Sequence, residues 1–430
     1  MSKSALLCVP EDVLCSLTIP DCRVLMMART CRGMRKLLTA RTSPVHVTVC
    51  KKVLTDSRLA RQFTCGMLHM QALFHIRHFE CIGFYNNTRC VDLKFCEFED
   101  LTFMHLHHFK MHHNQLREVH MINLLYILTF SRGLRTFQFT QQSMTCRHIP
   151  ALAGAIRCFE KLEVLDLENN FLVFDSVGVV LDAVQSSTLS TLKLSTNCCE
   201  DAQKTMKLSR VIHSNCNCLR ILELSFIRLR NKSVESLAGA IRACPLLESL
   251  DLSRNHLHCD SLAQILTSTA SCRRLHSFNW SGNRLGCAGT FLLTNHISNS
   301  EQWTSTMRVL KLRSCDIYSG MQQLTKALTV CMRLAVLDVS GNAVRAHEIG
   351  PLFTDMRLHS LDISSNYISD FGMQALLRLA KQNTTLKNFQ VYGNHITRHS
   401  VSVLRRMKKT RQMTITVPLV VCPCDACQIA

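Results

Sequence analysis

Histidine and cysteine clusters are the residues best placed to do chemistry in this chain. The stretch HLHHFKMHH holds five histidines, and His108 and His112 would share one face of a helix. The tail CPCDAC offers three thiols, at Cys422, Cys424 and Cys427, with no histidine nearby. A zinc site needs four ligands in a matching frame, and neither cluster supplies one. We therefore predict no metal site, and a loose thiol-rich end is the simpler interpretation of the tail.

Signatures of catalysis are missing from the sequence. It has no phosphate-cradling Gly-Lys-Ser/Thr loop, no Gly-x-Ser-x-Gly elbow and no His-Glu-x-x-His pair. The segment AHEIGPL comes near the last of these, but Pro351 stands where the second histidine belongs. We expect the chain to be no enzyme and to bind no cofactor.

Composition limits the classes of protein further. The 430 residues are 47% hydrophobic with a net charge of +19, and their mean hydropathy is +0.08. The chain opens without a secretory signal and has no apolar run near the roughly 20 residues of a membrane helix. Its 24 cysteines are then expected to be reduced thiols. These features predict an intracellular protein, cytoplasmic or nuclear, with no membrane span.

A repeat organises most of the chain. Each copy has a leading apolar residue, apolar residues three and five positions later, and often Asn eight positions later. Successive copies start 28, 27, 30, 28, 28, 32, 27, 24 and 28 residues apart. Ten copies begin at Leu134, Leu162, Leu189, Leu219, Leu247, Leu275, Met307, Leu334, Leu358 and Leu386.

The physical logic of the repeat is a short strand followed by a helix. Neither buries enough apolar surface alone, so stacked copies must share one core between a parallel sheet and a helical layer. Asn at position eight can bond the backbone where the chain leaves the strand, and we predict a structural ladder of Asn170, Asn197, Asn255, Asn283, Asn342, Asn366 and Asn394. Core packing is likewise predicted for thiols three residues before a leading position, which are Cys216, Cys244, Cys272 and Cys331.

This pattern resembles the leucine-rich repeat, and its period near 28 resembles the ribonuclease-inhibitor class. The resemblance implies an α/β solenoid, a horseshoe with parallel strands inside and helices outside. We expect the solenoid over residues 76–412, with degenerate copies at CVDLKFCEFEDLTF from Cys90 and LREVHMINLL from Leu116. Residues 46–75 would form a connecting helical region. Residues 413–430 would form a cap, with a last strand in RQMTITVP, followed by the Cys-rich tail.

The first 45 residues follow a different pattern, in which apolar residues at helical spacing are interrupted by IPDC. This segment resembles the F-box, and the matching residues are Val9, Pro10, Glu11, Asp12, Val13, Leu14, Ile19, Pro20, Val24, Leu25, Cys31, Arg32, Arg35 and Leu37. It departs from that motif at Val9, Gly33 and Met34, where leucine, a basic residue and tryptophan are usual. The resemblance implies a small all-α segment; the alternative is a plain cap on the first repeat.

An F-box would dock onto the Skp-type adaptor of a cullin ubiquitin ligase. Its apolar anchors would be Val9, Pro10, Val13, Leu14, Leu17, Ile19 and Leu25. The protein would then be the substrate-recognition subunit of that ligase. The alternative is a non-catalytic leucine-rich-repeat scaffold or inhibitor, of the ribonuclease-inhibitor or immune-receptor kind, without a ligase link.

The inner wall of the repeats is the expected surface for a protein target. Position four of the frame faces that wall, and five of its ten residues are acidic and two basic. We place the excess positive charge elsewhere, on the outer helices, the amino-terminal segment and VLRRMKKTRQ, a run without aromatics that gives no support for specific nucleic-acid binding. The hypothesis is a basic or polar protein target bound by Asp166, Glu223, Asp251, Asn279, Asp338 and Asp362. The alternative is that Asp at this position belongs to the repeat frame, whatever the target.

Overall fold

The computed structural model describes residues 16–19, 45–49, 76–82, 106–112, 118–172, 175–411 and 414–416. It divides into two compact units, residues 1–199 and 200–430. Unit 1 contains β1 (Ser16–Ile19), β2 (Val45–Val49), β3 (Ile76–Ile82), β4 (His108–His112), α6 (Glu118–Leu128), β5 (Thr136–Thr140), η3 (Cys146–His148), α7 (Ile149–Cys158), β6 (Val164–Asp166), α8 (Ser176–Ala183) and β7 (Thr191–Lys193).

Unit 2 contains the rest of the array. Its elements are α9 (Ala202–Ser214), β8 (Ile221–Glu223), η4 (Asn231–Ser233), α10 (Val234–Arg242), β9 (Ser249–Asp251), α11 (Cys259–Thr269), β10 (Ser277–Asn279), α12 (Gly286–Asn299), α13 (Glu301–Thr306), β11 (Val309–Lys311), α14 (Met321–Leu328), β12 (Val336–Asp338), η5 (Ala346–Glu348), α15 (Pro351–Thr354), β13 (Ser360–Asp362), α16 (Asp370–Gln382), β14 (Asn388–Gln390), α17 (Arg398–Arg411) and β15 (Thr414–Thr416).

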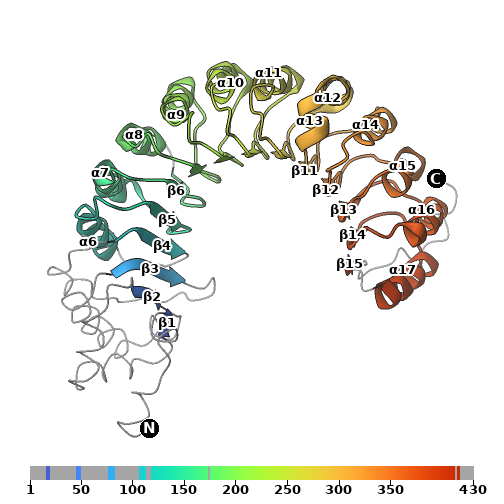
Figure 1. Cartoon of the computed structure of the whole chain (residues 1–430), viewed down its shortest axis with the longest axis horizontal. Coiled ribbons are helices and arrows are strands. Elements are labelled where there is room, and N and C mark those ends of the chain that lie inside the picture. The colour runs from blue at the N-terminus through green and yellow to red at the C-terminus, as the bar shows by residue number, and fades with distance from the viewer. Residues whose placement is uncertain are drawn as a thin grey trace, which may run out of the picture. The chain divides into compact units, whose positions relative to one another are not determined.

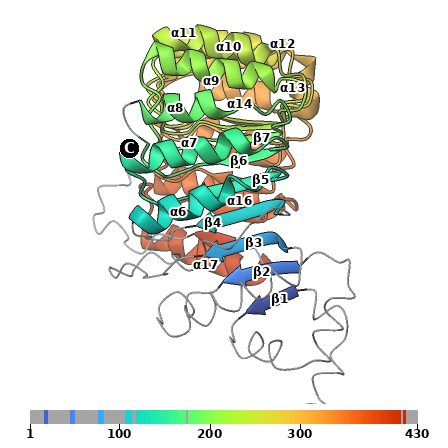
Figure 2. The same cartoon turned by 90° about the vertical axis from the view of Figure 1, so that its left-hand side faces the viewer.

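Within each unit the strands are parallel and pair in chain order, with helices on one side (Figures 1 and 2). Parallel strands stand about 4.8 Å apart whereas packed helices need about 8–10 Å, so the strand side of each unit is concave. The two apolar residues of each strand frame are buried, as at Leu250 and Leu252, which are 0% exposed. The predicted α/β leucine-rich-repeat solenoid is confirmed.

The Asn ladder is confirmed atom by atom. The Oδ1 atom of Asn255 accepts from the backbone N–H groups of Ile227 and Leu229 at 3.1 and 3.0 Å. Its Nδ2 donates to the carbonyls of Leu224 and Leu252, each at 2.9 Å. One amide side chain thus satisfies buried backbone groups in two successive repeats.

Three copies have a residue other than Asn at the ladder position: Ile227 has no polar group to contribute, whereas Gln142 and Cys315 continue the ladder. The Nε2 atom of Gln142 donates to the Met111 carbonyl at 3.0 Å, reaching the preceding repeat as an Asn would. The thiol of Cys315 donates to the Trp280 carbonyl at 3.5 Å. The ladder therefore continues through two copies whose sequences depart from the Asn rule.

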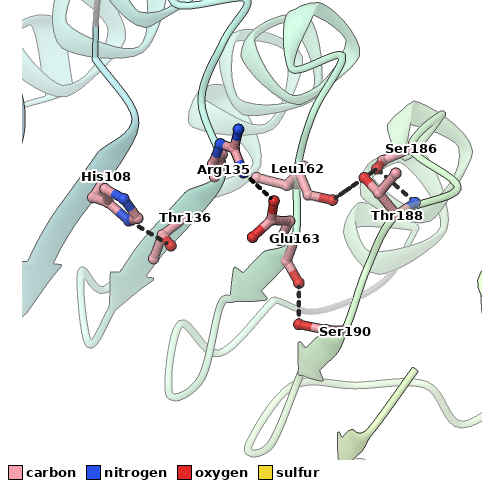
Figure 3. A network of polar contacts seen from close by, with 8 residues as sticks. All are labelled: His108, Arg135, Thr136, Leu162, Glu163, Ser186, Thr188 and Ser190. Atoms are coloured by element: carbon pink, nitrogen blue, oxygen red, sulfur yellow. Dashed lines mark hydrogen bonds and ion pairs between the residues drawn. The ribbon is translucent and has the colours of Figure 1, made fainter. Parts of the chain in front are cut away.

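Polar side chains near the strand ends add further bonds between successive repeats of unit 1 (Figure 3). His108 Nδ1 lies 2.9 Å from Thr136 Oγ1, and Arg135 donates to Glu163 at 2.8 Å. The Leu162 carbonyl accepts from Ser186 and Thr188 at 2.7 and 2.9 Å. These contacts fix the register of each strand against the next.

The expected helical character of the amino-terminal region is wrong at two places. Ser16–Ile19 and Val45–Val49 are strands, paired in parallel with each other, and β2 pairs with β3. Both segments alternate residues with period two and are rich in β-branched side chains, which favours a strand. The sheet thus includes strands inside both the segment expected to be all-α and the expected connecting helical region.

One copy of the repeat was missed, and a neighbouring one was misplaced. LHHFKMHHNQL has the full frame from Leu106, with Leu106, Phe109 and Met111 all 0% exposed. His108 and His112 therefore lie on a strand, and the helix face predicted for them is wrong. The expected copy from Leu116 falls largely in helix α6 of that repeat. At the other end, β15 confirms the predicted last strand.

Candidate functional site

The concave face of unit 2 holds five of the six predicted target-binding residues. They are the last residues of strands β8, β9, β10, β12 and β13, and paired registers place Glu223 beside Asp251, Asp251 beside Asn279, and Asp338 beside Asp362. Neighbours in such a row stand about 4.8 Å apart. Each of the five side chains is partly exposed. The members of the unit 2 row are Glu223, Asp251, Asn279, Asp338 and Asp362, which we call the acidic row.

The aspartates of the acidic row also serve the repeat itself. Oδ1 of Asp251 accepts from the backbone N–H and hydroxyl of Ser253 at 2.8 and 2.6 Å, and Asp338 accepts from Ser340 at 2.9 and 2.6 Å. Oδ2 of Asp251 accepts from Asn279 Nδ2 at 2.7 Å. One carboxylate oxygen thus bonds the residues that follow the strand, and the other oxygen can accept hydrogen bonds along the concave face.

Asp166 differs from the acidic row because it lies in unit 1 and is 5% exposed. Its two oxygens accept from the Glu168 backbone N–H and from Gln138 Nε2, each at 3.2 Å. Burial raises the pKa of this carboxyl above its ordinary value, and the hydrogen bond from Glu168 opposes the rise. A carboxylate this covered presents little surface to a partner.

Some positive charge also lies on and beside the concave face of unit 2. Lys311 interrupts the acidic row between Asn279 and Asp338, and it is exposed. At the amino-terminal edge of the strands, the frame's second residue is basic and exposed in four repeats of unit 2, at Arg220, Arg308, His359 and Lys387, and Arg220 is paired with Glu248. These edge residues are the second of each frame, so the charges counted at position four did not include them.

The predicted adaptor-binding residues are largely outside the described residues. Leu17 and Ile19 lie in strand β1, where the end of a helix and the IPDC break were expected. Val9, Pro10, Val13, Leu14 and Leu25 lie outside the described ranges. The anchors of the F-box resemblance therefore stay predictions, and the one described portion has strand backbone.

Three of the four cysteines predicted to pack in the core are buried. Burial raises the pKa of the Cys244 thiol to about 12 and of the Cys272 and Cys331 thiols to about 11, which keeps them protonated and unreactive. Cys216 is partly exposed. The ladder residue Cys315 is buried as well, and its pKa is raised to about 12.

The described parts of the chain contain no cluster of side chains that could bind a metal ion. Among those residues no group of three or more His, Cys, Asp or Glu side chains is placed to hold a metal ion. His108 and His112 instead bond to threonines of the next strand, and burial lowers the pKa of His108. The tail thiols lie outside the described residues. No described helix is both long and apolar enough to cross a bilayer.

Comparison with known proteins gives likeness of fold. No model of a known protein family matches the chain, and no curated protein matches its sequence. A solved structure of an internalin (InlF) from Listeria monocytogenes is similar at 15% identity and a TM-score of 0.42, over 86% of this chain and 97% of that one. The structure of the Rad7 and Elc1 complex in yeast is similar at 12% identity and a TM-score of 0.50, over 92% of this chain and 88% of that chain. At this identity the likeness to the yeast structure is one of fold alone, and the fold is the leucine-rich-repeat solenoid described above.

Proposed function

We propose that the protein is a non-catalytic binding subunit that holds a target protein on the concave face of its repeats. The observation that carries this proposal is the acidic row, partly exposed polar side chains on strands β8 to β10 and on β12 and β13 of unit 2. Such a row presents a rigid pattern of acceptors at a fixed spacing, and the basic edge beside it supplies charge of the opposite sign. A target with basic groups facing the row and acidic groups facing Arg308 and Lys387 would match both.

The test removes charge without changing shape. Asp251→Asn, Asp338→Asn and Asp362→Asn are combined in the full chain, and tagged proteins are compared by quantitative affinity capture. We expect specific partners to fall by about tenfold, since several charged contacts are lost together. A matched control neutralises three exposed acidic residues of the helical side, Glu235, Asp260 and Asp355. Equal capture by both triple variants would refute the concave-face proposal.

A more specific second candidate is the substrate-recognition subunit of an SCF-type cullin ubiquitin ligase. Two observations favour it: the F-box resemblance of Val9 to Leu14 directly before a repeat array, and the fold likeness to a structure in which Rad7 is complexed with Elc1. One observation weighs against it, because β1 occupies part of the expected helix. The scaffold without a ligase link therefore stands as the simpler form of the proposal.

The two candidates are separated by substitutions in the full chain. Deleting residues 1–45 would remove β1, all of its connection to β2 and the first residue of β2. Pro10→Ala and Val13→Asp are preferable, since both lie outside β1. The ligase candidate expects Skp-type adaptor and cullin to co-purify with the natural chain and to be lost from this double variant. Capture of concave-face partners with neither ligase component, from either chain, would favour the scaffold.

A further inference from the structure

The outer side of unit 2 carries a groove that the concave-face proposal does not use. Its volume is about 700 Å³ and it lies where η5 meets α16. Its lining residues come from the loop and turn before α15, from the loop between β13 and α16, from α16 and from the loop after β14: Arg345, Ala346, His347, Gly350, Tyr367, Ser369, Phe371, Gly372, Ala375, Leu376, Leu379 and His395.

The groove exists because one repeat is short. The copy from Leu334 spans 24 residues, whereas its neighbours span 27 and 28. Its outer side has only the 3₁₀ turn η5 and the four-residue α15, beside the eight-residue α14 and the thirteen-residue α16 (Figure 1). A full helix here would cover the flank of α16, and the short turn leaves that flank open.

Close backbone approach gives the groove its depth at one end. A Cβ atom on Gly372 would stand 2.6 Å from the Cβ of Ala346, so η5 and α16 touch where glycine alone fits. The floor is apolar, with Leu376 1% exposed.

Large aromatic side chains stand on the rim. Phe371 is 82% exposed and Tyr367 60% exposed. The Tyr367 ring stacks on His395, with centroids 5.9 Å apart and planes at 22°. Exposed aromatic side chains beside an apolar hollow are typical of protein interfaces, where tyrosine and arginine often dominate the binding energy.

The lining has no carboxylate; besides the Tyr367 phenol, its ionisable groups are Arg345, His347 and His395. The nearby carboxylates are directed elsewhere. Glu348 accepts from the backbone N–H of Arg345 at 2.7 Å. Asp370 accepts from Thr397 N–H at 2.8 Å and Gln374 at 3.0 Å. The Arg345 guanidinium makes no ion pair with any residue in the described ranges, and its side chain is exposed.

We propose that this groove binds a short acidic segment of a partner protein, with a large apolar side chain on its floor and carboxylates beside Arg345 and His347. The apolar floor and aromatic rim account for the buried anchor, and the one-sided charge accounts for the acidic flanks. The site is separate from the acidic row, so it stands or falls independently of the concave-face proposal.

The test selects random twelve-residue peptides displayed on phage against the full chain and against Ala375→Trp. Ala375 is exposed on α16, so the indole fills the groove without disturbing the core. We expect peptides with a large apolar residue next to Asp or Glu to be enriched on the natural chain, and recovery to be about tenfold lower on Ala375→Trp.

Labelled copies of the enriched peptides then give affinities by fluorescence anisotropy. Arg345→Glu should weaken binding about tenfold by replacing attraction with repulsion. Two matched controls should bind normally: Arg378→Glu, exposed on the same helix outside the groove, and Phe291→Ser, an aromatic 65% exposed on α12. The acidic-row triple variant should bind normally too.

Three results would overturn the proposal. One is equal phage recovery from the natural chain and Ala375→Trp. Another is enrichment of peptides without acidic residues, or affinities that Arg345→Glu leaves unchanged. The third is a dimer, seen by sedimentation at rising concentration and abolished by Ala375→Trp, because it would assign the groove to a second copy of this chain.

Discussion

The Asn ladder and the acidic row are two polar lines that recur with the same period, yet they serve different ends. Six of the seven predicted ladder residues are buried, at 7% exposure or less, and ladder amides both donate and accept across repeats. The acidic row is partly exposed, and one carboxylate oxygen of Asp251 or Asp338 fixes the exit of its own strand. Polar residues that recur in each repeat therefore serve the fold, and the exposed groups that the fold does not use are available to bind a partner.

Removing a ladder amide should have the largest effect on stability. In Asn255→Ala, the Leu224 carbonyl and the backbone N–H groups of Ile227 and Leu229 lose their buried partner, while the Leu252 carbonyl keeps Asn283. An unsatisfied buried group costs about 1–3 kcal/mol, so we expect the free energy of unfolding to fall by about 3 kcal/mol or more. Urea unfolding followed by circular dichroism measures it. Asn279→Ala, at a partly exposed position of the acidic row, is the control. An equally large loss of stability there would mean that the ladder is no more important to the fold than the acidic row.

The second effect concerns the thiol in the ladder. Cys315 sits where other repeats have Asn, donating to the Trp280 carbonyl. Cys315→Val keeps the volume but removes a weak donor; the Trp280 carbonyl still accepts from Asn283 Nδ2 at 3.1 Å, so the expected cost is about 1 kcal/mol. Cys315→Ser restores a donor and should lie closer to the natural chain in the same urea assay. If valine proves as stable as serine, the thiol acts only as core packing.

Within the acidic row, the two roles of aspartate can be separated. Asp251→Asn keeps an acceptor for the backbone N–H of Ser253 and should change the free energy of unfolding by less than about 0.5 kcal/mol. Asp251→Ala loses both bonds to Ser253 and should cost about 1 kcal/mol, whereas the bond from Asn279 is lost in both variants because an amide nitrogen cannot accept it. Thermal unfolding of the pair measures the difference. Identical stabilities would mean that the carboxylate contributes nothing to its own repeat.

The sequence was enough to predict the repeat, its two layers, the ladder and the burial of Cys244, Cys272 and Cys331, because each follows from periodic placement of apolar or amide groups. The copy from Leu106 was missed because its histidines were interpreted as possible metal ligands on a helix. Leu106, Phe109 and Met111 nevertheless occupy the apolar positions of the repeat and are buried. The groove was out of reach for another reason. A 24-residue spacing shows that a repeat is short, but the side that loses the residues is visible only in three dimensions.

The smallest predicted effect is a pH dependence at Asp166. Its folded-state pKa is raised by burial, so the folded chain binds more protons than the unfolded chain between the ordinary value of 3.8 and the folded value. The free energy of unfolding therefore falls as pH rises through that window, and the cost persists above it. Asp166→Asn removes this titration while leaving groups that can bond Gln138 and Glu168.

The comparison to make is the difference in stability between Asp166→Asn and the natural chain, from about pH 4 to about pH 7, by urea unfolding. Other titrating groups are common to both chains and cancel. The variant should gain stability relative to the natural chain as pH rises. A relative loss would mean that the hydrogen bonds to the carboxylate outweigh its burial, and would place Asp166 with the residues that the repeat needs in charged form.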